Sequence, residues 1–336
     1  MNNDEEKITV KSKALYALDK LGIAYRIKGR DAQLLDHDSL HIELDEKYLD
    51  HWKRWSTGDS GQNAKSLIYY LVQDGLIDIT DSEKHKFVQE FLYDSKEFKD
   101  KFKKIKTEKA RPFNYDEMVT NPNHFIASKY LENVRHLNPV LIQEMFNKGL
   151  IVQDGRDNIR FLWQNVEGKF VGAEVQGTRI DYKKFGKRGT LKMTMPGSKC
   201  FFNVSYGSEI KEVYLFEATI DLLSYIELLK FLNKPLDGKM FISMSGSVSK
   251  VVNVLNELVN DFKIDFNQVK VHFATDNDDA GNSAYLKGKK WLTEQFPNTI
   301  VERNLPHNGT DVMIDGAARS LKDWNEYLVF LKGGAQ

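Results

Sequence analysis

The chain has 336 residues, of which 41% are hydrophobic, and its 48 basic residues balance 48 acidic ones. A single cysteine, Cys200, excludes a disulfide framework, and no run approaches the roughly 20 apolar residues of a membrane span. Zero net charge argues against wholesale electrostatic capture of nucleic acid, and the acidic start "MNNDEEKITVKSK" is unlike a signal peptide. We therefore expect a cytoplasmic protein of two or three domains with no membrane partner.

The first 80 residues predict a small domain. The run "KSKALYALDKLGI" indicates a helix, and "SLHIEL" and "HWKRW" alternate like short strands. The turn-rich "STGDSGQN" then leads into an apolar helical stretch. This order predicts a small sheet with a following helix over residues 1–80.

Residues 81–122 predict a linker between domains. Lys, Glu and Asp dominate the first part, and its phenylalanines fall at helix-compatible spacings: Phe87, Phe91, Phe98 and Phe102. This composition favours a solvated helical linker over a binding surface. The run "RPFNYDEMVTNP" predicts an irregular crossing into the next domain.

A third segment covers residues 123–208. It opens with two predicted helices, "FIASKYLENVR" and "VLIQEMFNKG", and continues with the strand-like runs "NIRFLWQNV", "KFVGAEVQGTR" and "TLKMTMPG". Between residues 150 and 200, ten Lys or Arg residues face five acidic ones, whereas acids are in excess over residues 211–330. Such a division suits a protein that holds a polyanion beside a metal cluster, although it also arises by chance.

From residue 209 onward, strand and helix alternate strictly. The predicted strands "EVYLFE", "KMFISMSG", "QVKVHFATD" and "TIVERNLP" are separated by helical runs and are mostly apolar on both faces. This pattern predicts an α/β fold with a parallel sheet flanked by helices, behind an α+β upstream module.

Three carboxylates stand at predicted strand ends. Glu217 ends "VYLFE", while Asp276 and Asp278 end "VHFATD". Because the carboxyl ends of parallel strands open at one edge of a sheet, we expect these acids to converge there. Their repulsion calls for a cation, and Mg²⁺ or Mn²⁺ prefers oxygen ligands, so the pattern predicts a metal site for phosphate chemistry. The alternative is an Asp-rich turn that caps the helix beginning near Ala280.

These residues resemble the Toprim domain, which is shared by DnaG-type primases, type IA and II topoisomerases and some nucleases. The matching positions are Glu217, Asp221, Gly246, Asp276, Asp278, Ala280 and Gly281. The resemblance implies that Glu217, Asp276 and Asp278 hold catalytic Mg²⁺ or Mn²⁺, supported by Asp221, Gly246 and Gly281. Ala218 stands where primases usually have glycine, which crowds the backbone slightly.

The resemblance extends upstream. The runs "KYLENVRHLNPVLIQEMFNKGLI" and "IRFLWQNVEGKFVGAEVQGTR" resemble the helical opening and strand pair of a DnaG-type primase core. Residues 123–208 are thus expected to form a primase-core-like basic subdomain before a Toprim domain at 209–336. The likeness implies that Arg179 and Lys192 contact nucleotide phosphates or template. Each lysine of the basic run, taken singly, fits a solvated loop better, but as a cluster upstream of a metal site the run favours nucleic-acid binding. The further candidates from this run are Arg160, Lys183, Lys184, Lys187, Arg188 and Lys199.

Both ends of the chain add weaker resemblances. Residues 38–72 resemble the zinc ribbon of DnaG-type primases in layout but lack its cysteines, and the histidines His37, His41 and His51 make no four-ligand set. No zinc is expected, and Trp52, Trp55 and Leu40 are predicted to fill the ribbon's core. The run "KDWNEYL" resembles the end of Toprim segments in plasmid-borne proteins of Gram-positive bacteria that travel with conjugation genes. Asp323 in this run is either an additional metal ligand or a surface charge near a helix cap.

Three functions fit these features. The leading prediction is a primase that copies single-stranded DNA from NTPs in plasmid replication or conjugative transfer, with Trp163 either stacking on bases or lying in the core. The alternatives are a Toprim-type nuclease and a non-catalytic single-stranded DNA-binding module that recruits other proteins. The chain lacks G-x-x-x-x-G-K-[ST], so any helicase or relaxase partner is expected to be a separate protein.

Overall fold

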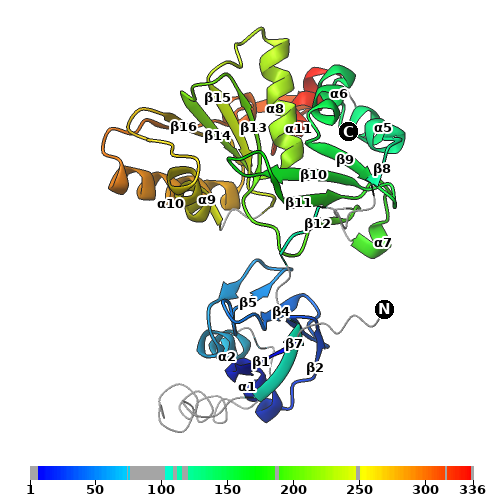
Figure 1. The fold of residues 1–336 in the computed structure, drawn as a ribbon, viewed down its shortest axis with the longest axis vertical. Coiled ribbons are helices and arrows are strands. Elements are labelled where there is room, and N and C mark those ends of the chain that lie inside the picture. The colour runs from blue at the N-terminus through cyan, green and yellow to red at the C-terminus, as the bar shows by residue number, and fades with distance from the viewer. Residues whose placement is uncertain are drawn as a thin grey trace. The chain divides into compact units, whose positions relative to one another are not determined.

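The computed structural model describes residues 7–73, 75, 103–108, 112–115, 120–185, 189–246, 250–314 and 316–333. The chain divides into two compact units, Met1–Arg111 and Pro112–Gln336, each with hydrophobic core of its own (Figure 1). Within the described ranges, none of the helices combines the length and the apolar composition needed to cross a membrane.

The N-terminal unit contains a five-stranded antiparallel sheet with the order β2-β3-β4-β5-β6 and two helices that pack against each other. These elements are α1 (Lys13–Leu21), α2 (Ala64–Gln73), β2 (Tyr25–Lys28), β3 (Asp31–Leu34), β4 (Leu40–Glu43), β5 (Trp52–Arg54) and β6 (Ser60–Gly61). Ser12 caps α1 because its Oγ accepts the Leu15 N–H at 3.0 Å, and Gly22, with φ of 68°, ends the helix. The predicted small sheet with a following helix is therefore present.

The predicted core of this unit is right for two residues and wrong for one. Leu40 and Trp52 are buried, but Trp55 is 63% exposed. Positions three apart on an extended segment point to opposite faces, so Trp52 and Trp55 cannot enter the same core. Trp55 instead lies on the surface with the Lys53 ammonium 4.0 Å from its ring centroid.

Part of the predicted helical linker is a strand. Residues 76–102 lie outside the described part of the chain, but β7 (Lys103–Glu108) pairs antiparallel with β1 (Lys7–Ser12). In "KKIKTE" the buried Ile105 is flanked by the exposed Lys104 and Lys106, which is the period-two pattern of a strand. The strand was not predicted because this short alternation lies within a highly charged segment and its partner strand lies far away in the sequence.

The C-terminal unit contains an antiparallel sheet covered by helices α5 (Phe125–Asn133) and α6 (Pro139–Asn147). The strand order is β12-β11-β10-β9-β8. The bounds of these strands are β8 (Thr120–Asn121), β9 (Ile151–Asp154), β10 (Ile159–Gln164), β11 (Phe170–Gln176) and β12 (Lys192–Thr194). A short helix, α7 (Tyr182–Phe185), lies between β11 and β12.

A second sheet in this unit has the order β13-β15-β14-β16-β17 and confirms the predicted α/β fold. All its pairs are parallel except that of β13 with β15. Its strands are β13 (Phe202–Tyr206), β14 (Glu212–Phe216), β15 (Lys239–Ser243), β16 (Lys270–Phe273) and β17 (Val301–Arg303). One face packs on α8 (Thr219–Phe231) and α11 (Trp324–Leu331), and the other on α9 (Val251–Asn260) and α10 (Asp279–Gln295).

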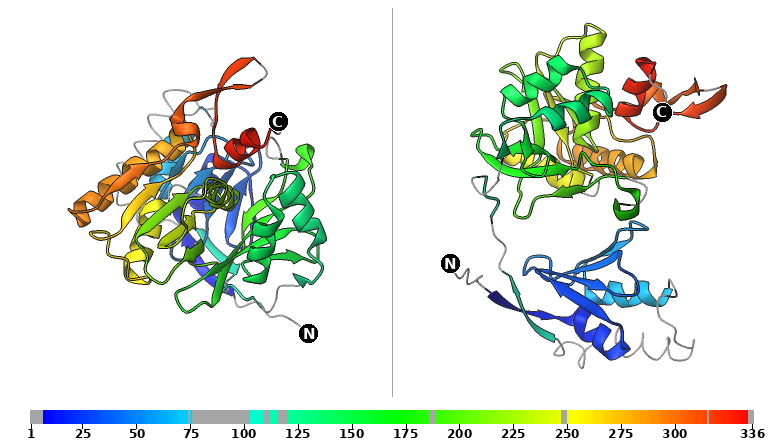
Figure 2. Two further views of the ribbon diagram at one scale, coloured as in Figure 1. Left: turned by 90° about the horizontal axis from the view of Figure 1, so that it is seen from above. Right: turned by 90° about the vertical axis from the view of Figure 1, so that its right-hand side faces the viewer.

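Between β17 and α11 the chain forms a 3₁₀ turn, η3 (Pro306–Gly309), and a hairpin of β18 (Asp311–Ile314) and β19 (Ala317–Ser320). Figure 2 shows this hairpin extending away from the sheet. The chain then returns to the sheet edge at Leu321, which is buried. The hairpin therefore delivers the "KDWN" run to the edge where β14 and β16 end.

The predicted boundary at residue 209 does not separate two cores. Strand β13 precedes it but pairs with β15, and one hydrophobic cluster extends from Ala127 to Leu328. Trp163, a candidate for base stacking, is buried in that cluster. The antiparallel and mixed sheets are thus joined in one compact unit.

Glu144 on α6 is one of the polar links across this joint. It accepts hydrogen bonds from Lys148 at 2.8 Å, from Tyr206 at 2.9 Å and from Lys230. Burial alone would raise the pKa of Glu144, but these donors lower it to about 2. Its ionised form therefore stabilises the fold above the ordinary pKa of 4.5, and this contribution is lost as the pH falls toward 2.

We expect Glu144→Gln to lower the free energy of unfolding by about 1–2 kcal/mol at pH 7, after allowing for solvent screening of the side chain. The difference should shrink between pH 4.5 and pH 2. Urea unfolding at pH 7 and pH 3 measures both effects. Glu132→Gln is the matched control, because Glu132 only faces Lys129 at 3.6 Å on the surface of α5. Equal losses at the two pH values would contradict the role of the charge.

Candidate active site

The predicted acids lie at the carboxyl edge of the parallel strands. Leu215 of β14 is paired with Phe273 of β16, so the chain segments that follow these residues emerge side by side. Glu217 directly follows β14, and Asp276 and Asp278 follow β16. The convergence predicted from the two strand ends is therefore what the sheet register produces.

The electrostatics of this edge are those of crowded carboxylates. Burial, then the charges of Glu217 and Asp323, raise the pKa of Asp276 from 3.8 to about 7. Burial and the charge of Asp278 likewise raise the pKa of Glu217. The pKa of Asp221 rises well above its ordinary value through burial, Asp323 and Asp276. Among the described residues, the positive charges near these carboxylates do not offset burial and mutual repulsion, so their ionised forms are disfavoured.

Lys322 lies against the two aspartates of the "DND" segment. Its Nζ is 3.1 Å from Oδ2 of Asp278 and 3.7 Å from Oδ2 of Asp276. Although partial burial opposes it, hydrogen bonding from the Gly281 N–H and from Lys322 lowers the pKa of Asp278. The "DND" acids thus already share one cationic group that belongs to the chain.

The side chains of Glu217, Asp276 and Asp278 are chemically suited to bind a hard divalent cation. All three offer carboxylate oxygens, and Oε2 of Glu217 is buried without a hydrogen-bond partner. However, within the described ranges no three His, Cys, Asp or Glu side chains are grouped so that they could hold a metal ion. The acids are therefore suited to a cation, but their side chains are not yet arranged around one.

The helix-cap alternative is also realised. Asp278 is the N-cap of α10 and accepts the Gly281 N–H at 2.9 Å, while Asp323 is the N-cap of α11 and accepts the Glu326 N–H at 2.7 Å. In both residues the cap uses Oδ1. Since neither cap uses Oδ2, and Oδ2 of Asp278 already faces the Lys322 ammonium, capping and cation binding are compatible at these positions.

The supporting residues hold the loops that carry the acids. The Gly246 N–H donates to the Glu217 carbonyl oxygen at 2.7 Å, in a turn where Gly246 has φ of 75°. Gly281 has no room for a side chain, since a Cβ there would overlap the Asp276 carbonyl oxygen. Asp221 accepts the Asn325 N–H at 3.1 Å and so joins α8 to α11.

Two residues at this edge were missed by the sequence analysis. Arg303, half-buried on β17, donates to the carbonyl oxygens of Asp276 at 2.8 Å and Gly281 at 3.0 Å. Glu174, a buried residue of β11, accepts from Oγ1 of Thr219 at 2.9 Å, and burial raises its pKa. The signal for Glu174 is a charged residue in the apolar run "VGAEV", whereas Arg303 offers no local signal.

Lys192 is the basic candidate best placed for the acids. It begins β12, and its positive charge partly offsets the rise that burial causes in the pKa values of Glu174, Glu217 and Asp221. Its side chain therefore lies within electrostatic reach of the acidic edge.

The other basic candidates are placed differently. Arg160 is mostly buried in an ion pair with Asp154 at 2.9 Å, so it serves the fold of the antiparallel sheet. Arg179 is exposed and pairs with Asp157 at 3.1 Å. The lysines on exposed surface are Lys183, Lys184 and Lys199. Lys187 and Arg188 lie outside the described residues.

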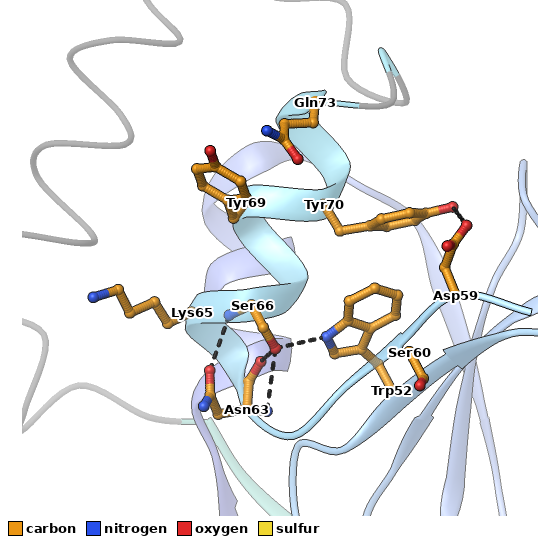
Figure 3. A pocket seen from close by; sticks show the side chains of 9 residues that line it. All are labelled: Trp52, Asp59, Ser60, Asn63, Lys65, Ser66, Tyr69, Tyr70 and Gln73. Carbon is orange, nitrogen blue, oxygen red and sulfur yellow. Dashed lines mark hydrogen bonds between the residues drawn. The ribbon is translucent and has the colours of Figure 1, made fainter. Parts of the chain in front are cut away.

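A hollow of about 490 Å³ lies in the N-terminal unit (Figure 3). Its lining residues are Trp52, Asp59, Ser60, Asn63, Lys65, Ser66, Tyr69, Tyr70 and Gln73. The Trp52 indole donates to Oγ of Ser66 at 2.9 Å, and the Tyr70 hydroxyl to Asp59 at 3.2 Å. A smaller hollow of about 290 Å³ adjoins Asp323, between Arg135 and Glu326. Of the two, only the smaller one borders an acid of the candidate site, namely Asp323.

This fold and site define a Toprim-like domain. Residues 214–328 match the family model described as Toprim-like. This range includes Glu217, Asp221, Asp276, Asp278 and Asp323 but not Glu174. The predicted Toprim domain is thereby confirmed. Residues 129–201 match a model described as a protein of unknown function, DUF3991.

Among individual proteins, the chain is 31% identical over 225 residues to the uncharacterized protein pXO2-78 of Bacillus anthracis, which is named after the plasmid pXO2. The match covers 66% of this chain and 60% of that protein, so the chain spans less than two thirds of its relative. The primase fragment of the bacteriophage T7 primase-helicase aligns over 88% of this chain and 90% of that one, with 16% identity and a TM-score of 0.41. A DnaG primase catalytic domain bound to single-stranded DNA aligns over 80% and 76%, with 13% identity and a TM-score of 0.36.

Proposed function

We propose that this protein is a DNA primase, a nucleotidyltransferase that synthesises short primers on single-stranded DNA. The observation that carries the proposal is the meeting of Glu217, Asp276 and Asp278 at one sheet edge of a Toprim-like domain, with raised pKa values at the first two. Such a cluster is suited to phosphoryl transfer, because that chemistry depends on positioning and on neutralising phosphate charge.

Each residue has a distinct proposed task. Glu217, Asp276 and Asp278, with Asp323 beside them, would hold Mg²⁺ or Mn²⁺. A bound cation supplies positive charge for the triphosphate and lowers the pKa of an attacking hydroxyl. Lys192 would bind nucleotide phosphates, because it lies within electrostatic reach of the acids. Gly281 and Gly246 would keep the acid-bearing loops in place.

The template and the setting belong to the same proposal. The exposed Arg179, Lys183, Lys184 and Lys199 would contact the phosphates of single-stranded DNA, which are read without sequence preference. We place the enzyme in the cytoplasm, in plasmid replication or conjugative transfer, where a separate helicase or relaxase would supply the single strand. The plasmid name of the Bacillus anthracis relative supports this setting.

Two other functions use the same residues. A Toprim-type nuclease would direct the acids at a water molecule and cleave DNA. A non-catalytic recruitment module is favoured by one observation, namely that Lys322 lies 3.1 Å from Asp278 and 3.7 Å from Asp276, where a metal ion would otherwise bind. An assay must therefore separate synthesis, cleavage and binding.

The test incubates the full chain with single-stranded DNA, labelled NTPs or dNTPs, and Mg²⁺ or Mn²⁺. We expect the label to enter short oligomers, and expect Glu217→Gln to reduce incorporation by roughly a hundredfold or more. The matched control is Glu209→Gln, since Glu209 is an exposed glutamate with only a 3.8 Å surface contact to Lys211. Shortened DNA without incorporation would identify a nuclease. DNA binding with neither reaction would identify a recruitment module, and either result would overturn the primase proposal.

A further inference from the structure

We propose that Lys322 is a built-in counter-cation that occupies the cation position between Asp276 and Asp278 and competes with the divalent metal for these two carboxylates. The inference rests on the proposed metal-dependent function and adds to it the residue that sets the metal affinity. The carrying observation is geometric, because the Lys322 Nζ lies 3.1 Å from one aspartate and 3.7 Å from the other.

The backbone of Lys322 is fixed to the segment it neutralises. The N–H of Asn277, between the two aspartates, donates to the Lys322 carbonyl oxygen at 2.7 Å. The Asn277 side chain donates to Oγ of Ser320 at 2.9 Å, and the Lys322 N–H donates to the carboxylate of Glu326. These bonds join the exit of the β18–β19 hairpin to the "DND" loop. The Lys322 stem therefore starts from a defined point beside the acids.

The ammonium group of Lys322, in contrast, can move away from the two aspartates. Its side chain is 58% exposed, whereas that of Asp276 is 11% exposed. A lysine ammonium is strongly hydrated and sits on a flexible stem, so withdrawing it into water requires little rearrangement. Lys322 therefore combines a fixed backbone with an ammonium group that a metal ion can replace.

One ammonium also leaves the acids incompletely neutralised. With Lys322 in place, the charge of Asp278 still opposes ionisation of Glu217, and Oε2 of Glu217 still has no partner. A divalent ion brings twice the charge and accepts oxygen ligands from several directions. Metal binding should therefore displace Lys322 from the two aspartates.

The experiment measures Mn²⁺ binding to the full chain by calorimetry at pH 8 in low salt, without nucleotide or DNA. Lys322→Met keeps the length of the stem and removes the competitor, so we expect Mn²⁺ affinity to rise about tenfold. Lys322→Arg keeps the charge and pairs with carboxylates through two donors, so we expect affinity to fall about threefold. Lys211→Met, at a lysine that is 69% exposed, should leave affinity unchanged.

Unchanged or weaker Mn²⁺ binding by folded Lys322→Met would overturn the inference while leaving the proposed function intact. If that variant folds poorly without metal, the arginine variant decides, and affinity equal to or above that of the wild type would overturn the inference. If neither the wild type nor any variant binds Mn²⁺, the proposed metal-dependent function fails together with it.

Discussion

Asp276→Asn is expected to abolish primer synthesis and at the same time to make the metal-free protein more stable at pH 8. Incorporation should fall roughly a hundredfold to a thousandfold, because one proposed cation ligand loses its charge. The free energy of unfolding should rise by about 1–3 kcal/mol, because the wild type must keep a buried carboxylate ionised among other acids. A residue needed only for folding would shift both quantities in the same direction.

The pH dependence follows from the pKa of about 7 at Asp276 against an ordinary value of 3.8. Between these values the folded protein binds a proton that the unfolded chain does not, so wild-type stability falls as the pH rises from 3.8 to about 7 and levels off above it. Asparagine cannot titrate, and it has the shape of the protonated aspartate. The stabilisation of Asp276→Asn should therefore be fully present at pH 8 and reduced to roughly a third of that value at pH 5.

Urea unfolding in EDTA at pH 5 and pH 8, together with the incorporation assay, measures all three effects. Asp279→Asn is the matched control, since Asp279 lies in the first turn of α10 in the same segment but is exposed. We expect it to retain incorporation and to lose a few tenths of a kcal/mol through its weaker interaction with the helix N-terminus. A loss of stability by Asp276→Asn at pH 8 would show that Asp276 acts mainly in folding.

The main features of the fold and the three central acids were predictable from sequence. The apolar runs ending at Phe216 and Phe273 are buried on both faces, and such runs separated by helices have few arrangements other than a parallel sheet. Once those two strands are neighbours, their following acids must meet. Glu217, Asp276 and Asp278 were therefore predictable because their positions depend on regular periodicity.

What could not be predicted depends on contacts between distant segments. Lys322 reaches the acids only because Asn277 binds the chain 44 residues onward, at Leu321. Arg160 looked like any other member of the basic run until Asp154 was found beside it at 2.9 Å. Strand β7 forms because it pairs with β1, which lies close to the other end of the unit in sequence. In each case the local residues are ordinary, and the partner determines the role.

Gly281→Ala is expected to lower the free energy of unfolding, although helix propensity alone predicts an increase. Gly281 lies in the first turn of α10, where alanine would ordinarily stabilise the helix by about 1 kcal/mol. In this position the new Cβ would overlap the Asp276 carbonyl oxygen and lie 3.0 Å from the carbonyl carbon. Both atoms are backbone, and Arg303 donates a hydrogen bond to the same oxygen at 2.8 Å, so neither atom can move easily.

We expect Gly281→Ala to lower the free energy of unfolding by roughly 2–3 kcal/mol, the range of an overpacked core site. Because the displaced backbone carries Asp276, Mn²⁺ affinity and incorporation should fall as well, even though no carboxylate has been removed. Asn282→Ala is the matched control, since Asn282 is the next residue of the helix and is exposed. Urea unfolding and Mn²⁺ titration of the two variants measure the predicted losses of stability and of Mn²⁺ affinity. Equal stability of the two would mean that the "DND" loop can move away from α10, in which case the close approach at Gly281 does not position Asp276.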